Sequence, residues 1–123
     1  MAREILTARL GARKATDEPT VGWVEGMSTA DAWEHGRSWW RMNPGRAIEC
    51  ELMLILDPDY TVIAVGTIDG LMKGENYTEF KRAEIVGEVI DDHEYMGCTV
   101  NRTGSQNPIS YVTDRDIIAP TDS

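Results

Sequence analysis

The feature that most constrains the fold is the pair of apolar segments at residues 51–56 and 60–68, ELMLIL and YTVIAVGTI. Both are rich in branched and apolar side chains, as β-strands are, and Asp57, Pro58 and Asp59 between them are typical turn residues. The sequence therefore predicts a β-hairpin. Because residues 51–56 are almost continuously apolar, we expect both faces of that strand to be covered.

Two short helices are predicted before this hairpin. Ser28 has the pattern of a helix cap with Asp31 three positions later in the capping-box place, although Glu or Gln is more usual there. The helix that it starts is expected to run to about residue 35 and to stop at Gly36. The dipeptide Asn43-Pro44 repeats the start signal, a cap followed by Pro at the first helical position. It predicts one or two helical turns that end near residue 48.

The rest of the chain predicts short strands and loops. Residues 69–78 contain two glycines, an asparagine and several charges, which favour a longer surface loop. Residues 80–90 are expected to form a strand whose latter half has an apolar face. An acidic stretch at residues 91–94 is expected to be a hairpin loop. Two more short strands are predicted near residues 96–101 and 109–113.

Together these elements predict an α+β fold, either a small β-barrel or a strongly curved mixed sheet with one or two short flanking helices. Residues 50–113 are expected to form a mainly antiparallel sheet, with both helices closing one side of it. A chain of 123 residues is one domain on ordinary size grounds. We expect a strand or arm at residues 1–19, the domain proper at residues 20–113 and a polar tail at residues 114–123.

Composition and charge exclude several classes of protein. With 41% hydrophobic and 27% charged residues, the chain is unlike a disordered or fibrous sequence. No apolar run approaches the roughly 20 residues of a membrane span, and the first residues lack an apolar signal core, so we expect a cytoplasmic protein without a membrane partner. The net charge of −9 argues against broad, nonspecific binding to nucleic acid, which depends on Lys and Arg. Seven of the twelve basic residues lie in the first 46 positions, which allows a local basic patch.

Two stretches carry more polar and aromatic side chains than a turn requires. One is GSQNPISYV at residues 104–112, and the other is RSWWRMNP at residues 37–44. Binding a flipped or free nucleobase needs an aromatic face for stacking, together with donors and acceptors for the base edge. The aromatic face would come from Trp39, Trp40 and also Trp23.

The polar groups of the same stretches complete such a pocket. Ser105, Gln106 and Asn107 would bind the base edge, because a carboxamide offers a donor and an acceptor in one plane. Arg37 and Arg41 could hold a phosphate through their forked donors. The alternatives remain open: each tryptophan could be a core residue, Asn107 could cap the turn before a proline, and the arginines could pair with surface acids.

The order of elements resembles small domains of the PUA-like superfamily, which includes the EVE, ASCH and YTH modules. The resemblance covers roughly residues 20–113 and is carried by the Trp-Trp-Arg segment, the Asn-Pro helical turn, VIAVGTIDG, IVGEV and GSQNPISYV. It implies a compact β-barrel with helices at its flank and a pocket that receives a base, commonly a modified one, from RNA or DNA. The chain departs from members that bind long nucleic acids in its acidity.

The sequence also contains groups that an enzyme could use. The candidate groups are His35, His93, Cys50, Cys98 and the acidic turn at residues 91–95, whose spacing matches no zinc pattern. No nucleophile-elbow, metalloprotease or phosphate-loop motif is present. Two cysteines without CxxC spacing predict buried thiols rather than a disulfide framework. We therefore expect a non-enzymatic module without metal or cofactor.

A third class is a small acidic interaction or inhibitor protein that covers a basic surface of another protein. The charge is compatible with it, and Trp and Arg are favoured in interfaces. An interaction protein of this kind would not explain the neighbouring carboxamides of Gln106 and Asn107. The sequence leaves open the identity of the base, the choice between RNA, DNA and free nucleotide, and the oligomeric state.

Overall fold

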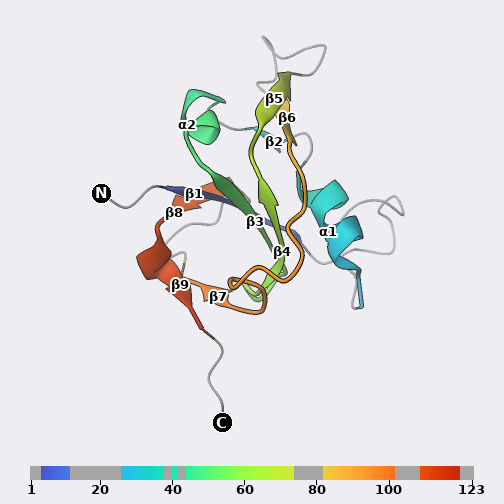
Figure 1. Ribbon diagram of the computed structural model, residues 1–123, viewed down its shortest axis with the longest axis vertical. Coiled ribbons are helices and arrows are strands. Elements are labelled where there is room, and N and C mark those ends of the chain that lie inside the picture. Colours follow the sequence, from blue (N-terminus) through green and yellow to red (C-terminus); the bar gives the residue numbers. More distant parts are fainter. Residues whose placement is uncertain are drawn as a thin grey trace.

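The computed structural model describes residues 4–11, 26–37, 40–41, 44–73, 82–101 and 109–119. They form an α+β protein with a mixed four-stranded sheet, two small sheets and two short helices (Figure 1). The elements in chain order are β1 (Ile5–Arg9), α1 (Thr29–Gly36), β2 (Trp40–Arg41), α2 (Pro44–Ile48), β3 (Leu52–Leu56), β4 (Val62–Thr67), β5 (Gly70–Lys73), β6 (Arg82–Val86), β7 (Thr99–Val100), β8 (Ile109–Val112), the 3-10 helix η1 (Asp114–Asp116) and β9 (Ile117–Ile118). In this part of the chain, no helix is both long and apolar enough for a membrane span.

The predicted hairpin is confirmed. β3 and β4 pair antiparallel, with Leu52 opposite Thr67. The turn between them is closed by the Asp57 carboxylate, whose Oδ1 accepts hydrogen bonds from the backbone N–H groups of Asp59 at 2.8 Å and Thr61 at 3.0 Å. This is the local hydrogen bonding for which Asp is favoured in turns.

The large sheet has the strand order β4-β3-β1-β8, in which β1 is parallel to β3 and antiparallel to β8. The expectation of a mainly antiparallel sheet built from residues 50–113 is therefore wrong, because a central strand comes from the first nine residues. Four of the five residues of β1 are buried, as expected for a strand covered on both faces. The described strands form an open sheet and no closed barrel, so the mixed-sheet alternative holds.

One face of this sheet is covered by both helices and β6. The buried residues that meet there are Leu6, Ala8, Met53, Ile55 and Ala64 from the sheet, Ala32 and Trp33 from α1, Ala47 from α2 and Ile85 from β6. Since α1 and α2 contribute to the same core cluster, the prediction that the helices close one side of the sheet is confirmed.

The opposite face is covered by residues that follow β6. There Ile5, Leu54, Leu56, Val65 and Val112 of the sheet pack with Cys98 and with Val100 of β7. β7 pairs with β9, which adds the partly buried Ile117 to the same cluster. Both faces of β3 are thus covered, as its nearly continuous apolar sequence predicted.

The two predicted helices are present. Ser28 caps α1, since its Oγ accepts a hydrogen bond from the backbone N–H of Asp31 at 3.1 Å. The helix ends at Gly36, and α2 begins at Pro44, as expected. Asn43, the predicted cap of α2, lies outside the described residues.

Two glycines bring α1 close to the sheet. A Cβ on Gly66 of β4 would lie 2.4 Å from ring atoms of Trp33, and one on Gly36 would lie 2.3 Å from a side-chain atom of Ile55. Neither separation is possible between real atoms, so both positions need glycine for this packing. The ring of Trp33 therefore rests directly on the backbone of β4.

The surface loop predicted at residues 69–78 is wrong for residues 70–73, which form β5. This strand pairs antiparallel with β6 in a small sheet of order β2-β6-β5. Met72 of β5 is exposed, so the strand lacks the buried apolar run by which longer strands are recognised. Residues 74–78 lie outside the described residues.

The acidic stretch forms a turn, as predicted, but it does not close a hairpin. β6 pairs with β2 and β5, whereas β7 pairs with β9. Carboxylates indicate a turn without specifying which strands it joins, and this explains the error. β7 and β8 fall within the two predicted strand ranges, and the part of the expected tail at residues 114–118 forms η1 and β9.

Candidate ligand-binding site

The tryptophan stretch leads into the edge of the small sheet. Trp40 and Arg41 form β2, whose backbone pairs antiparallel with Ala83 and Arg82 of β6. For β2 the structure describes the backbone and not the side chains. The remaining predicted site residues outside the described chain are Trp23, Trp39, Ser105, Gln106 and Asn107. Their roles stay predictions.

Arg37, a predicted phosphate ligand, is held by acidic groups. Its Nη2 donates to Glu34 at 2.9 Å, and its Nη1 forms an ion pair with Glu84 at 2.7 Å. Nη1 also donates to the backbone oxygen of Ile85 at 3.2 Å. The hydrogen bond to Glu34 is the main cause that raises the pKa of Arg37. A phosphate at Arg37 would have to compete with two carboxylates, which is the pairing that the sequence left open as its alternative.

A second arginine lies where α2 meets β8. The guanidinium carbon of Arg46, on α2, is 4.1 Å from the ring centre of Tyr111, on β8. The same guanidinium binds Glu4 through two parallel hydrogen bonds, Nε to Oε1 at 2.9 Å and Nη2 to Oε2. The side chains of Arg46 and Glu4 are 49% and 41% exposed. We call these three residues the α2–β8 corner.

Cys50 lies beneath this corner, and its Sγ donates to the backbone oxygen of Arg46 at 3.5 Å. Desolvation by burial, followed by the negative charge of Glu4, raises the pKa of the Cys50 thiol to about 11. The thiol is therefore protonated near neutral pH and is a poor nucleophile. Cys50 and Cys98 are both buried and free, as the sequence predicted.

The corner connects the two informative stretches of the sequence. α2 begins three residues after β2 ends, and β8 begins two residues after Asn107. A chain spans at most about 3.6 Å per residue, so the path from Trp40 to Arg46 covers at most about 22 Å and that from Asn107 to Tyr111 at most about 14 Å. Sequence reasoning missed Arg46 and Glu4, since the only signal was that Arg46 closely follows RSWWRMNP.

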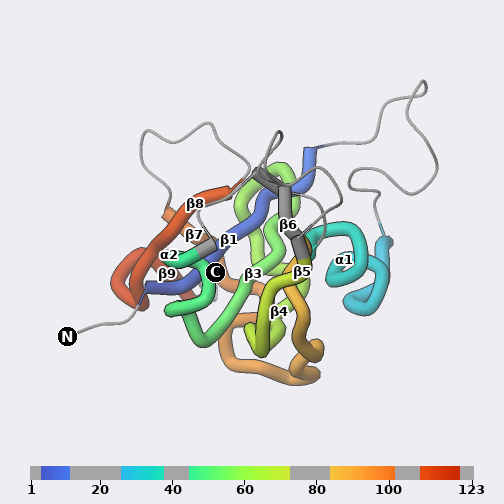
Figure 2. The backbone as a smooth tube through the Cα atoms, turned by 90° about the horizontal axis from the view of Figure 1, so that it is seen from above, coloured from blue at the N-terminus to red at the C-terminus, as the bar shows by residue number. Residues whose placement is uncertain are grey.

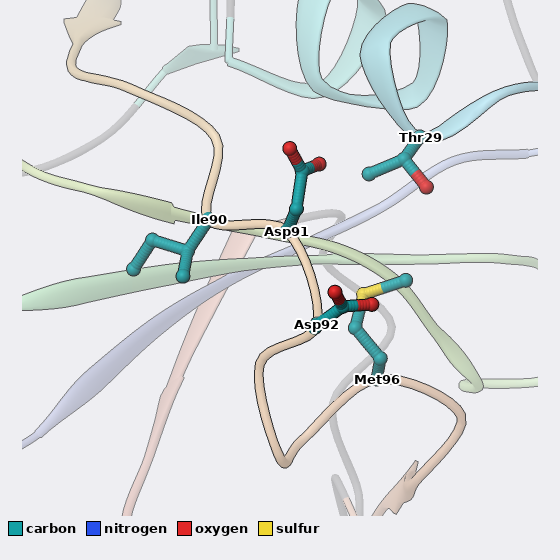
Figure 3. A pocket seen from close by; sticks show the side chains of 5 residues that line it. All are labelled: Thr29, Ile90, Asp91, Asp92 and Met96. Carbon is teal, nitrogen blue, oxygen red and sulfur yellow. The ribbon is translucent and has the colours of Figure 1, made fainter.

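A hollow of about 300 Å³ lies at the start of α1, lined by Thr29, Ile90, Asp91, Asp92 and Met96. Figure 3 shows the Asp92 carboxylate beside the Met96 side chain, with the Asp91 carboxylate apart from both. Both carboxylates are exposed. Among the described residues, the lining has no ring to stack on a base and no carboxamide to bind its edge. In both Figure 1 and Figure 2, α1 lies on the opposite side of the molecule from α2 and β8.

The two histidines that could serve in catalysis belong to different elements, His93 to the turn at residues 91–97 and His35 to α1. Nδ1 of His93 accepts a hydrogen bond from the backbone N–H of Tyr95 at 3.1 Å, and the two rings are in contact. Nδ1 of His35, on α1, is buried without a hydrogen-bond partner among the described residues. Within the described ranges, no group of three or more His, Cys, Asp or Glu residues could hold a metal ion. His93 is thus part of the turn at residues 91–97.

No model of a known protein family matches the chain, and neither a curated protein nor a solved structure does. The chemistry of the α2–β8 corner therefore has to be inferred from its own geometry. It combines a partly buried aromatic ring, a guanidinium over that ring and a half-exposed ion pair.

Proposed function

We propose that this protein is a non-enzymatic, PUA-like binding module whose pocket takes a nucleobase, either free in a nucleotide or in a short segment of RNA or DNA. Trp39 or Trp40 stacks on the base, with Trp23 as a further candidate. Stacking contributes about 1 to 3 kcal/mol per base. Ser105, Gln106 and Asn107 bind the base edge.

The observation that supports this proposal is the contact between Arg46 and Tyr111. It ties α2, which follows the tryptophans, to β8, which follows the carboxamides. A base pocket needs these two kinds of group on opposite sides of one ligand. A surface turn that was polar by chance would need no such connection.

The fold and the charge are compatible with a small ligand. The helices and β6 cover one face of the sheet. The net charge of −9 disfavours a long phosphate track, but one nucleotide requires contact with only one phosphate. We therefore place a single base, rather than an extended strand, in the pocket.

The test is a titration with nucleosides and short oligonucleotides, followed by tryptophan fluorescence. Asn107→Ala should weaken binding by about 1 to 3 kcal/mol, because it removes hydrogen bonds to a desolvated base edge, while the melting temperature changes little. Asn101→Ala, which removes the carboxamide of another, exposed asparagine, is the matched control. A variant of Asn107 that is less stable by roughly 0.5 to 2 kcal/mol but binds normally would identify a turn cap instead.

The two tryptophans supply a second test. Trp39→Ala and Trp40→Ala should differ: one variant keeps its stability and loses nucleoside binding, because only a ring that faces the pocket separates these effects. If both variants unfold to the same extent, both rings belong to the core, where the loss of a Trp side chain costs about 3 to 5 kcal/mol.

A second candidate is an acidic protein that binds a basic protein surface. It is favoured by the distribution of charge: among the side chains that the structure describes, the exposed basic ones are Arg46 and Arg115, whereas one turn alone exposes Asp91, Asp92 and Glu94. Such a protein would bind a basic partner in a salt-sensitive manner and leave its fluorescence unchanged by nucleosides. The same titrations therefore separate the two candidates.

A further inference from the structure

We propose that Arg46 recognises a phosphate group of the ligand and that Glu4 occupies its guanidinium in the ligand-free protein. The inference rests on the proposed function and deepens it, since it makes the ligand a nucleotide and not a nucleoside. Arg46 then contributes to specificity beside the residues that bind the base.

The geometry of Arg46 suits this role. The guanidinium carbon lies over the ring of Tyr111, while Nε and Nη2 donate to the two oxygens of Glu4. A planar guanidinium binds a carboxylate and a phosphate with the same pair of parallel donors. The contact with Tyr111 holds the guanidinium beside β8, so the pair of donors stays in the same place when the anion changes.

The present occupant is exchangeable. Glu4 and Arg46 are each nearly half exposed, and exposed ion pairs contribute little to stability because water screens them. Glu4 also lies outside β1, so the release of its side chain breaks no strand pairing. A phosphate monoester carries up to two negative charges and therefore attracts the guanidinium more strongly than one carboxylate does.

The other arginines whose side chains the structure describes are less suited to bind a phosphate. The guanidinium of Arg9 donates to the backbone oxygen of Pro58 and lies over Tyr60, which holds the turn between β3 and β4. Arg37 has two carboxylates. Arg115 is exposed on η1, and the structure shows no aromatic ring over its guanidinium among the described residues. Of these four arginines, Arg46 is the one that makes the contact between α2 and β8.

The experiment compares common ribonucleosides with the matching 5′-monophosphates by calorimetric titration. Wild-type protein should bind the monophosphate about tenfold or more tightly than the nucleoside, as a charged hydrogen-bonded contact would give. Arg46→Gln should abolish this preference, so that the nucleoside and its monophosphate bind with equal affinity. Glu4→Gln should increase the preference, since the competing carboxylate is gone. Arg115→Gln removes the same charge from an exposed site on η1 and should leave the preference unchanged.

Arg46→Lys distinguishes recognition from simple charge, because it keeps the cation but lacks the planar pair of donors. It should lose most of the preference, and circular dichroism should show each variant to be folded. A preference that survives in Arg46→Gln, or that disappears in Arg37→Gln instead, overturns the role of Arg46 while the base pocket stands. If no nucleoside or monophosphate binds wild type or Glu4→Gln, the proposed function is rejected and this role falls with it.

Discussion

The two helices cover the same face of the sheet but are attached to it differently. α1 is attached by packing: Trp33 is 5% exposed and rests on Gly66, and Gly36 lies against Ile55. α2 buries the small side chain of Ala47, while its neighbours Arg46 and Ile48 are exposed. The contacts of Arg46 with Glu4 and Tyr111 are polar and accessible.

This difference predicts separate roles for the two helices. Tight apolar packing cannot change without a large loss of stability, because a cavity or a clash replaces it. An exposed ion pair can exchange its partner at little cost. We therefore expect changes at α1 to affect folding and changes at α2 to affect ligand binding.

The largest expected effect is that of Trp33→Ala. Removing this ring from the interface between α1 and β4 should lower the free energy of unfolding by about 3 to 5 kcal/mol. Chemical denaturation measures the loss, and nucleotide affinity measured under conditions where the variant is folded should match that of wild type. A variant of normal stability with weakened binding would break the division between the two helices.

Gly66→Ala tests the same contact from the sheet side. Its added Cβ would collide with the ring of Trp33, which must shift, and overpacking of this kind costs about 1 to 3 kcal/mol. Gly70→Ala is the matched control, since a Cβ there would have no atom within 4 Å. Equal thermal stability of the two variants would show that the ring is not tightly held.

The parts of the fold that could be predicted from the sequence are those fixed by neighbours in the chain. The turn at Asp57 and the cap at Ser28 each depend on hydrogen bonds that span no more than four residues. The pairing of β1 with β3 depends on segments more than forty residues apart, and no local pattern specifies it. A residue pattern likewise does not show that Trp33 needs a glycine opposite it in β4.

The same limit applied to the candidate site. The tryptophan and carboxamide stretches were conspicuous because each is contiguous, and their side chains remain predictions. Arg46 and Glu4 are separated by 42 positions and were not recognised, since an exposed arginine in a short helix has no distinctive pattern. Only the fold places them together beside Tyr111.

A smaller effect is expected for Ser28→Ala, which removes the cap of α1. The backbone N–H of Asp31 would lose its acceptor, and the free energy of unfolding should fall by about 1 kcal/mol. Ser28→Asp should restore most of this loss, because its carboxylate also accepts at a cap. Thermal melts of both variants sharpen the comparison: they show how much of the stability at α1 comes from its end and how much from Trp33.

The smallest effect on stability is expected for Glu4→Gln, which removes the ion pair between Glu4 and Arg46. The hydrogen bond from Arg46 is the main cause that lowers the pKa of Glu4. A lowered pKa in the folded state means that the pair stabilises the protein above the ordinary pKa of a glutamate and that this contribution is lost as the pH falls through the lowered value. For an exposed pair the contribution is below about 1 kcal/mol. The difference in unfolding free energy between wild type and Glu4→Gln should therefore be small at neutral pH and vanish in acid. Glu88→Gln is the control, because it removes an exposed carboxylate outside the corner, and it should show no such trend. A difference that persists unchanged in acid would mean that Glu4 is attached by packing, as α1 is, and could not make way for a phosphate.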